Sequence, residues 1–575
     1  MFNQSRGSVF SYRSLVAVVL LLTLSPLQAF AAAPSAGDIL RQQPQPPAVV
    51  VPETPPAPLP VPAEKEKETG PKILVKGFRI KGAHLIPEAE LAAQLQGAIG
   101  KELSFRQLRA TTSILIAYYA HKGYLARVIL PEQDVRDGIV TLQVVEGKRG
   151  NLRINSIGSR IDSARVERLI DQRLGKGDAM NIADLGEALS ILNEQPGILS
   201  NSALVPGKGQ GDIDVVVTAL AKPLFGAALG VNNYGMKATG TLQESGSVTL
   251  SNPTGHFDVA TLTANVSDGT TYSRLDYSLA AGDSGLRLGA DASNLRYRLT
   301  QSSFSSLQAT GRADTVGLTA SYPLARRSAF NLSLTGSYDD KKLIDDTIAG
   351  ETGNHHVTVS NLGLSGYTLG NPDSLLGSGM TSFSADLGFG NSDQLNAAAL
   401  AADSTTRQEQ GHFNKLAYNA GYLLPITSKW SLNATLRGQF ADKNLNSTER
   451  FYLGGPDAVR AYPTGEATGD EGWLFSLNAT DNVSDSLAAH VFLDSGSIVL
   501  NRNLWNNWNA GSPGVPNRYM LSGAGVGLDW RMSPHMLVTA SIATPLGNNP
   551  GSTNGFNSDG SKVATRGWLG LNAQF

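Results

Sequence analysis

The amino-acid sequence predicts a β-barrel that spans a membrane, preceded by two small α/β units. Three observations favour this class. From Leu224 to Phe575, apolar and polar residues alternate with a period of two and helical periodicity is absent. Charged residues make up only 17% of the chain, and no run of about 18 apolar residues follows the N-terminal region. The segment before residue 224 instead has helical patterns between short strand patterns.

The first residues have the pattern of a secretory signal. Arg6 and Arg13 precede an apolar stretch, Leu15 to Leu24, and the triplet Ala-Phe-Ala at 29–31 fits a small-x-small cleavage site. The apolar stretch is shorter than the ~20 residues that a membrane span needs, which disfavours the alternative of a short membrane anchor. We therefore expect residues 1–31 to be a signal peptide and the mature protein to be exported.

A short helix and a linker are expected next. Residues 35–43 (SAGDILRQQ) fit one or two helical turns, and we assign 32–43 to this helix. The following segment, PQPPAVVVPETPPAPLPVP, is dense in proline, and EKEKETG comes after it. Such a composition cannot bury apolar surface and favours extended conformations, so residues 44–71 are expected to form a linker.

Residues 72–222 contain a weak internal duplication. The first unit, 72–147, is expected to run as a strand, two helices and two strands, at 73–80, 87–95, 105–121, 126–130 and 139–145. The second unit, 148–222, repeats this order at 152–157, 164–171, 182–193, 199–205 and 213–218. The longer helix of each unit carries apolar residues three and four apart, as a helix that packs on one face requires.

This order of elements, with the segments GYL at 123–125 and VVEG at 144–147, resembles the POTRA module, a periplasmic domain that binds extended polypeptide. Two generic α/β modules are the alternative. The resemblance implies that a partner strand adds to an exposed sheet edge, where backbone hydrogen bonds give affinity. Two segments are candidate edges, and the sequence does not choose between them; their residues are Ala126, Arg127, Val128, Ile129, Leu130, Leu199, Leu204 and Val205.

The C-terminal region, residues 223–575, predicts the barrel itself. In RLDYSLA at 274–280, apolar residues alternate with charged or polar ones, and the turn signal GDSG follows. At roughly 20 residues per strand and turn, about 350 residues give on the order of 16 antiparallel strands. The chain ends on LGLNAQF, an alternating strand with an aromatic terminus that suits barrel closure. A soluble β-sandwich is the alternative, and the long succession of strands disfavours it.

Strand parity assigns side chains to the two faces of this barrel. In VFLDSG at 491–496, the valine and the leucine share the apolar phase, so Phe492, Asp494 and Gly496 face a polar lumen. A carboxylate in a narrow lumen loses solvation and requires a cation. Arg460, in the long segment VRAYPTGEATGDEG, can supply a bidentate partner. Four aromatic residues near expected strand ends are assigned to interfacial girdles: Tyr322, Trp430, Tyr452 and Trp568.

The motif VRAY at 459–462 resembles the VRGY/F signature in the sixth extracellular loop of the Omp85 superfamily, and FLDSG at 492–496 resembles its partner motif F-x-D-x-G. Together with two POTRA-like units, a linker and a short helix, the mature chain resembles the two-partner secretion transporters (TpsB type, haemolysin-activator-like). The resemblance implies a loop–lumen lock, which consists of Val459, Arg460, Tyr462, Phe492, Asp494 and Gly496. One position departs from the signature, because the family's glycine is Ala461 here, and a positive φ there would be strained.

The resemblance also implies the biology. We expect a monomeric pore in the outer membrane of a Gram-negative bacterium, in contact with lipid, with the POTRA domains in the periplasm. It would export a large partner exoprotein that has an N-terminal secretion domain, and helix 32–43 would plug the lumen. The alternatives are an Omp85-type assembly insertase, which typically has more POTRA units, a diffusion porin, which lacks periplasmic domains, and an enzyme.

Signals for other chemistry are weak. The chain has no Cys, and its net charge of −2 shows no basic excess for a nucleic acid. His355 and His356 lie in a polar segment that is expected to be a loop, and no H-E-x-x-H motif occurs. The glycines of GAGVG at 523–527 precede a strand pattern, whereas a dinucleotide-binding loop precedes a helix. We therefore expect no catalytic site, metal, cofactor or nucleic-acid partner.

Overall fold

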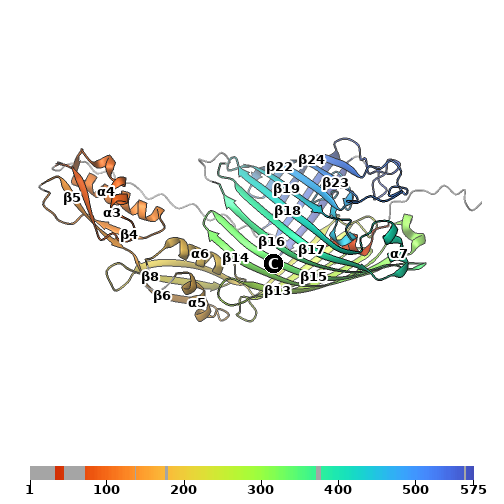
Figure 1. Ribbon diagram of the computed structural model, residues 1–575, viewed down its shortest axis with the longest axis horizontal. Coiled ribbons are helices and arrows are strands. Elements are labelled where there is room, and N and C mark those ends of the chain that lie inside the picture. Colours follow the sequence, from red (N-terminus) through yellow and green to blue (C-terminus); the bar gives the residue numbers. More distant parts are fainter. Residues whose placement is uncertain (1–32, 45–71, 136, 175–178, 371–376, 563–564) are drawn as a thin grey trace, which may run out of the picture.

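The computed structural model describes residues 33–44, 72–135, 137–174, 179–370, 377–562 and 565–575. Within these ranges, sixteen antiparallel strands form a closed barrel, and two α/β units lie in a row beyond one of its ends (Figure 1). The predicted fold class is confirmed. The expected signal peptide and the linker after Pro44 lie outside the described residues. None of the described helices has the length and apolar character that crossing a bilayer requires.

The barrel strands follow one another around the wall, and the last strand, β26, pairs with the first, β9. Their bounds are β9 (Phe225–Asn232), β10 (Gln243–Ser251), β11 (Val259–Val266), β12 (Thr270–Ala280), β13 (Arg287–Arg298), β14 (Thr310–Arg327), β15 (Phe330–Thr347), β16 (Gly350–Leu369), β17 (Met380–Gln394), β18 (Gly411–Pro425), β19 (Trp430–Ala441), β22 (Glu471–Ser484), β23 (Leu487–Val499), β24 (Arg518–Ser533), β25 (Met536–Pro545) and β26 (Arg566–Gln574). A helix, α7 (Ala397–Thr405), lies between β17 and β18.

The first α/β unit packs helices α3 (Glu88–Gln94) and α4 (Phe105–His121) against the three-stranded sheet β2–β5–β4. The strand expected at 73–80 is in fact two strands. β1 (Lys72–Leu74) pairs with β3 (Glu102–Ser104), whereas β2 (Gly77–Lys81) runs parallel to β5 (Ile139–Glu146). The interruption falls at Val75 and Lys76, whose backbone amides donate to carbonyls outside either strand ladder. β4 (Ala126–Ile129) is an edge strand.

The second unit repeats this architecture. β6 (Lys148–Ile157) and β8 (Asp212–Ala221) are parallel, and β7 (Ile198–Pro206) forms the antiparallel edge of their sheet. Helices α5 (Ser163–Leu174) and α6 (Ile182–Asn193) cover the sheet with apolar side chains. Both segments that were expected to be edges, in β4 and in β7, therefore pair with only one neighbour in the described part of the chain.

The second unit packs against the turns at the end of the barrel that lies beside it. Its apolar core continues into Phe257 and Ala280 of the barrel. The Arg165 guanidinium donates to the Ala280 carbonyl oxygen at 2.7 Å and lies over the Phe257 ring. Glu194, directly after α6, accepts a hydrogen bond from Arg326 Nε at 2.5 Å. Apolar contact and charged hydrogen bonds together hold this unit beside the mouth of the barrel.

Asp214 gives the second unit a pH-dependent stability. Its buried carboxylate accepts from the Asn151 amide at 2.8 Å and from Arg153 at 2.7 Å, and these contacts, the Asn151 amide first, hold the pKa of Asp214 below its ordinary value. A lowered folded pKa stabilises the folded state above the unfolded pKa of about 3.9, and this stability is lost as pH falls through the folded pKa. We expect hydrogen-exchange protection of β6 and β8 to fall below about pH 4.

The Asp214→Asn variant should lose much of this pH dependence, because it has no carboxylate to titrate. Asp137→Asn, at an exposed position in the first unit, is the matched control. If the protection of β6 and β8 follows the same pH profile in wild type and Asp214→Asn, another group controls the acid stability of this unit.

Candidate functional site in the barrel lumen

The segment between β19 and β22, residues 442–470, folds back into the barrel. It contains the short elements η3 (Ser447–Glu449), β20 (Phe451–Tyr452) and β21 (Thr468–Gly469). Val459, Ala461 and Tyr462 are almost fully buried and pack against inward side chains of β23, β24 and β25, namely Phe492, Leu521 and Ala543. The loop thus occupies the lumen.

Arg460 and Asp494 form a bidentate ion pair inside the barrel. Arg460 Nη2 lies 2.7 Å from Asp494 Oδ1, and Nε lies 2.8 Å from Oδ2. The Arg460 backbone amide also donates to Oδ2 at 3.1 Å. The Asp494 side chain is 0% exposed and that of Arg460 is 13% exposed. A carboxylate this deeply buried is stable only with such a set of charged and hydrogen-bonding partners.

Neighbouring side chains complete the environment of this pair. Ser476 Oγ donates to Asp494 Oδ1 at 2.5 Å, and Asn478 Oδ1 accepts from Arg460 Nη2 at 3.0 Å. Arg460 Cζ lies 3.4 Å from the centroid of the Phe492 ring, a close cation–π contact. Ser476 and Asn478 lie on the lumen-facing side of β22, and Phe492 lies on the same side of β23. The pairing of the two strands therefore surrounds the guanidinium with these side chains.

The other residues of the expected loop–lumen lock lie at the same place. The Val459 amide donates to the Leu453 carbonyl oxygen at 2.7 Å, which closes the tip of the loop. Tyr462 is buried beside it, and its hydroxyl has no hydrogen-bond partner among the described residues. A Cβ atom at Gly496 would lie 2.5 Å from Leu453 Cδ2, so glycine leaves the room that the loop fills.

Ala461 does not have a positive φ, so the strain considered above for this position is absent. Its methyl group instead faces Gly523 on β24. A Cβ atom built on Gly523 would lie 2.5 Å from Ala461 Cβ, closer than two carbon atoms pack. The wall therefore accommodates the alanine by having no side chain opposite it.

Two aromatic assignments were wrong. Trp568 does not belong to an interfacial girdle, because its side chain faces the lumen and Nε1 donates to the Arg460 carbonyl oxygen at 2.7 Å. Tyr452 lies in the loop, with the guanidinium carbons of Arg41 and Arg437 at 5.4 and 5.8 Å from its ring centroid. Strand phase could have identified Trp568, since Leu569 and its alternate neighbours occupy the apolar face.

A second ion cluster, which the sequence did not reveal, fixes the start of the loop. Glu449 accepts from Lys341 Nζ and from Lys415 Nζ, each at 2.8 Å. The two lysines come from β15 and β18, and Glu449 is almost fully buried between them. On the other side of the loop, the Glu466 carboxylate accepts from Asn549 and Ser558, between β25 and β26. The loop is therefore held to the wall at several separated points.

The short N-terminal helix also lies within the barrel, as α2 (Ala36–Leu40). Ser35 and Asp38 form a capping box, and the Ala36 amide donates to Asp345 Oδ1 of β15 at 2.8 Å. In Figure 1 the red helix lies towards the end of the barrel that is away from the α/β units. The helix contacts an apolar patch of the inner wall, although a polar lumen was expected; the patch includes Tyr272, Leu295, Ala313, Leu343, Val357, Val359 and Phe413.

Helix α2 and the loop contact each other directly. Ser35 Oγ donates to Ser447 Oγ at 2.9 Å, and Arg41 Nη1 donates to the Arg450 carbonyl oxygen at 2.8 Å. Gly37 lies so close that an added Cβ would be 2.8 Å from the Thr448 amide nitrogen. The helix and the start of the loop therefore form one packed unit inside the lumen.

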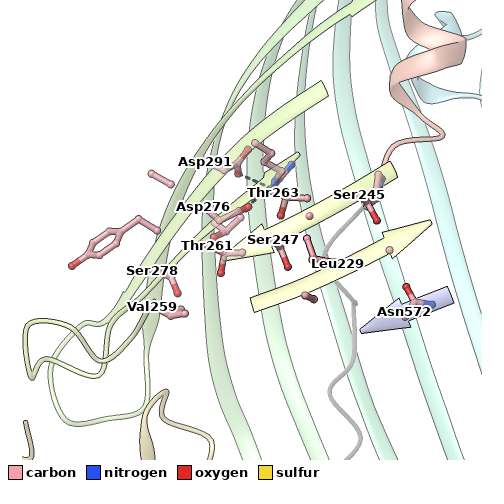
Figure 2. Close-up of a pocket in the computed structure, with 18 residues that line it drawn as sticks. Leu229, Ser245, Ser247, Val259, Thr261, Thr263, Asp276, Ser278, Asp291 and Asn572 are labelled. Atoms are coloured by element: carbon pink, nitrogen blue, oxygen red, sulfur yellow. Dashed lines mark hydrogen bonds and ion pairs between the residues drawn. The ribbon is translucent and has the colours of Figure 1, made fainter. Parts of the chain in front are cut away.

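The lumen beside β9 to β13 is open. A cavity of about 590 Å³ lies against these strands and reaches Asn572 on β26. Figure 2 shows hydroxyl-bearing side chains along its wall, among them Ser245, Ser247 and Thr261. Arg274 forms ion pairs there with Asp276 and Asp291 at 2.8 and 3.3 Å, so the charges on this wall are paired with each other.

The histidine pair was expected to lie in a loop, but it lies in a strand. His355 and His356 lie in β16, where His355 Nδ1 contacts Asn446 and His356 Nε2 contacts Asp340. The long strand β16 extends beyond the lipid-facing apolar part of the wall, and its residues there are polar. This polar composition explains why the segment was expected to be a loop. Across the described ranges, no group of three or more His, Asp or Glu side chains is placed to hold a metal ion.

Comparison with known proteins decides the family. Residues 211–529, more than half of the chain, match the family described as haemolysin secretion/activation protein ShlB/FhaC/HecB. The chain belongs to this family. Residues 73–147 match the ShlB-type POTRA domain. The protein is therefore an outer-membrane transporter of the two-partner secretion type with periplasmic POTRA domains, and the family favours this reading over an assembly insertase.

Individual relatives agree with this assignment. The transporter is 27% identical over 468 residues to the heme/hemopexin transporter protein HuxB of Haemophilus influenzae, with 80% of this chain and 81% of HuxB covered. It is 25% identical over 423 residues to the outer membrane transporter CdiB of Dickeya dadantii, with 71% and 73% covered. The solved structure of CdiB from Escherichia coli has the same fold, with a TM-score of 0.65 at 20% identity, covering 90% of this chain and 93% of that one.

Proposed function

We propose that this transporter carries one cognate exoprotein, recognised through an N-terminal secretion domain, from the periplasm through the barrel lumen to the cell surface. The observation that carries the proposal is the buried Arg460–Asp494 ion pair, which holds a long loop inside the pore. The chain would act as a monomer in contact with outer-membrane lipid, and without a catalytic step. The proposed domain boundaries, 72–147, 148–222 and 223–575, are supported by the POTRA match at 73–147 and by the start of β9 at Phe225.

In the resting protein, α2 and the start of the loop block the route. The open cavity beside β9 to β13 supports a path for extended polypeptide, because its wall has small and hydroxyl side chains and internally paired charges. A polypeptide that follows this wall has to displace α2 and the adjoining part of the loop. Helix α2 would then be a plug, held by few hydrogen bonds and so removable without unfolding the barrel.

The proposal is tested by co-expressing the full-length transporter with its cognate exoprotein and assaying the medium. We expect export with the wild-type chain, and we expect the exoprotein to remain in the periplasm when residues 72–222 are deleted. Heat-modifiable electrophoretic migration checks that the barrel still closes in the deletion variant. Export that does not depend on residues 72–222 would contradict capture by the POTRA domains.

We further propose that β7, rather than β4, is the edge that receives the partner. Leu199 and Leu204 of β7 are 50% and 39% exposed, which offers apolar contact beside the open backbone edge, whereas β4 exposes Arg127. β7 is also the nearer edge to the barrel, since a Cβ atom at Gly197, just before β7, would lie 2.9 Å from the Ser251 carbonyl oxygen of β10.

Replacing both Leu199 and Leu204 with Asp should weaken binding of the secretion domain to the purified transporter about tenfold or more, because burying an unpaired charge costs more than ~1.4 kcal/mol. Arg127→Asp on β4 is the control and should leave the affinity nearly unchanged. Isothermal titration calorimetry measures both. The reverse result, with only the Arg127 variant impaired, would move the binding edge to β4.

A further inference from the structure

A concave strip on the outer wall of the barrel runs across strands β19 and β22 to β26. Trp430, Asp481 and Ala489 are direct partners in the register of β19, β22 and β23, and Leu528, Ala540 and Leu569 continue the same row on β24, β25 and β26. Residues of one register row project on the same face of a sheet. Leu528 and Leu569 are exposed, whereas the adjacent Trp568 faces the lumen, so this row faces lipid.

The strip forms a groove of about 710 Å³, which we call the outer groove. Its floor has the small residues Ala479, Ala489, Ala540 and Gly567. Its margins have larger, exposed apolar side chains, namely Val491, Val526, Leu528, Ile542 and Leu569. A small-residue floor between branched side chains gives an elongated apolar depression, whose shape and polarity suit a hydrocarbon chain.

The outer groove has a defined orientation in the membrane. Trp430 is the first residue of β19, directly after the tight turn that follows β18, and Asn233 follows the last residue of β9. β9 starts beside the second POTRA unit, so Asn233 lies at the extracellular end and Trp430 at the periplasmic end of the wall. Trp430 and the nearby exposed Trp530 suit the lipid–water interface. Asp481 thus lies in the periplasmic leaflet.

Asp481 is an unusual residue for this face. Its Oδ1 atom is buried and has no hydrogen-bond partner among the described residues. An unpaired carboxylate at an apolar membrane surface is costly. Asp314 on β14 also faces outward, in phase with the exposed Val316, but it accepts from Asn294 Nδ2 at 2.6 Å. Asp481 has no such partner in the described part of the chain, and its other oxygen, Oδ2, is not buried, so a donor outside the protein can reach the carboxylate there.

We propose that the outer groove binds a phospholipid whose headgroup carries a primary ammonium, such as an ethanolamine phospholipid. The ammonium donates a hydrogen bond to Asp481 Oδ2, the carboxylate oxygen that is not buried, and one acyl chain lies along the floor of the groove. A quaternary ammonium has no N–H to donate, and an anionic headgroup without an amine is repelled by the carboxylate. The carboxylate thus selects the headgroup, and the groove holds the acyl chain.

The test uses the full-length protein in nanodiscs that contain equal amounts of an ethanolamine phospholipid and its N-trimethylated analogue with identical acyl chains. Native mass spectrometry after release counts the retained lipids. We expect wild type to retain the ethanolamine lipid preferentially and Asp481→Asn to lose about tenfold of that preference, since a hydrogen bond between charged groups is removed. Asp314→Asn, the matched control, should retain the wild-type preference.

A second variant tests the groove separately from the carboxylate. Ala540→Phe fills the floor and should reduce retention of both lipids. Equal retention of the two headgroups by wild type, or an unchanged preference in Asp481→Asn, would overturn headgroup recognition. Unchanged retention in Ala540→Phe would overturn the groove as the binding site. If a variant fails to close its barrel, as heat-modifiable migration reveals, the comparison of headgroups on the wild-type protein still decides.

Discussion

Replacing Arg460 with alanine should lower export of the cognate exoprotein about tenfold or more while the barrel still inserts and closes. The variant leaves the fully buried Asp494 carboxylate without its cation. Breaking a buried ion pair costs ~3–5 kcal/mol, and a tenfold change in an equilibrium needs only ~1.4 kcal/mol. The loop tip should therefore leave its seat against β23 to β25 and obstruct the open path beside β9 to β13, which lowers export, whereas the backbone ladder of the strands does not depend on this contact.

The measurements are the amount of exoprotein in the medium and heat-modifiable migration of the transporter. Arg460→Lys keeps a positive charge but cannot form the bidentate ion pair, so we expect an intermediate loss of export. Arg298→Ala removes an exposed arginine whose side chain donates to the Asp268 carbonyl oxygen of a neighbouring turn, and this variant should export normally. Normal export by Arg460→Ala would mean that the ion pair is not needed for secretion, and loss of the closed barrel would assign it to folding instead.

Replacing Gly37 with valine should open the pore. A Cβ atom at this position would lie 2.8 Å from the Thr448 amide nitrogen and would also overlap the Ser447 hydroxyl, so the helix can no longer pack against the loop. Release of α2 leaves only the loop inside a barrel that is wide enough for an aqueous channel, and we expect single-channel conductance in planar bilayers to rise at least about twofold.

The control for this experiment is Gly226→Val on β9, where an added Cβ meets no atom within 4 Å. This variant should conduct like wild type. Conductance of Gly37→Val at the wild-type level would show that α2 does not limit the current, and the plug assignment would then have to be abandoned.

Strand parity was the most informative property of the sequence. It placed Phe492, Asp494 and Gly496 on one face because side chains alternate strictly along a strand, and the structure has all three directed at the loop. The same parity places Trp568 in the lumen, because Leu569 and Leu571 occupy the lipid-facing phase of β26. His355 and His356 were misassigned because a strand that extends beyond the bilayer is polar on both faces.

Contacts between distant segments could not be predicted in this way. Glu449 meets Lys341 and Lys415 from strands far apart in the sequence, and neither periodicity nor a local motif records that meeting. The apolar patch beneath α2 was missed for a related reason. Parity identifies which residues face the lumen, but only the tertiary structure shows that a helix, and not water, covers Leu295 and Val357.

The contact between Ala461 and Gly523 implies a rule for exchanging parts between relatives. The loop tip and the wall together have room for a single methyl group, and in this protein the loop carries it. A loop with glycine at position 461 could therefore be combined with a wall that has alanine at 523, but two alanines would collide. Chimeras of such transporters should thus be designed with these two positions inherited as a pair.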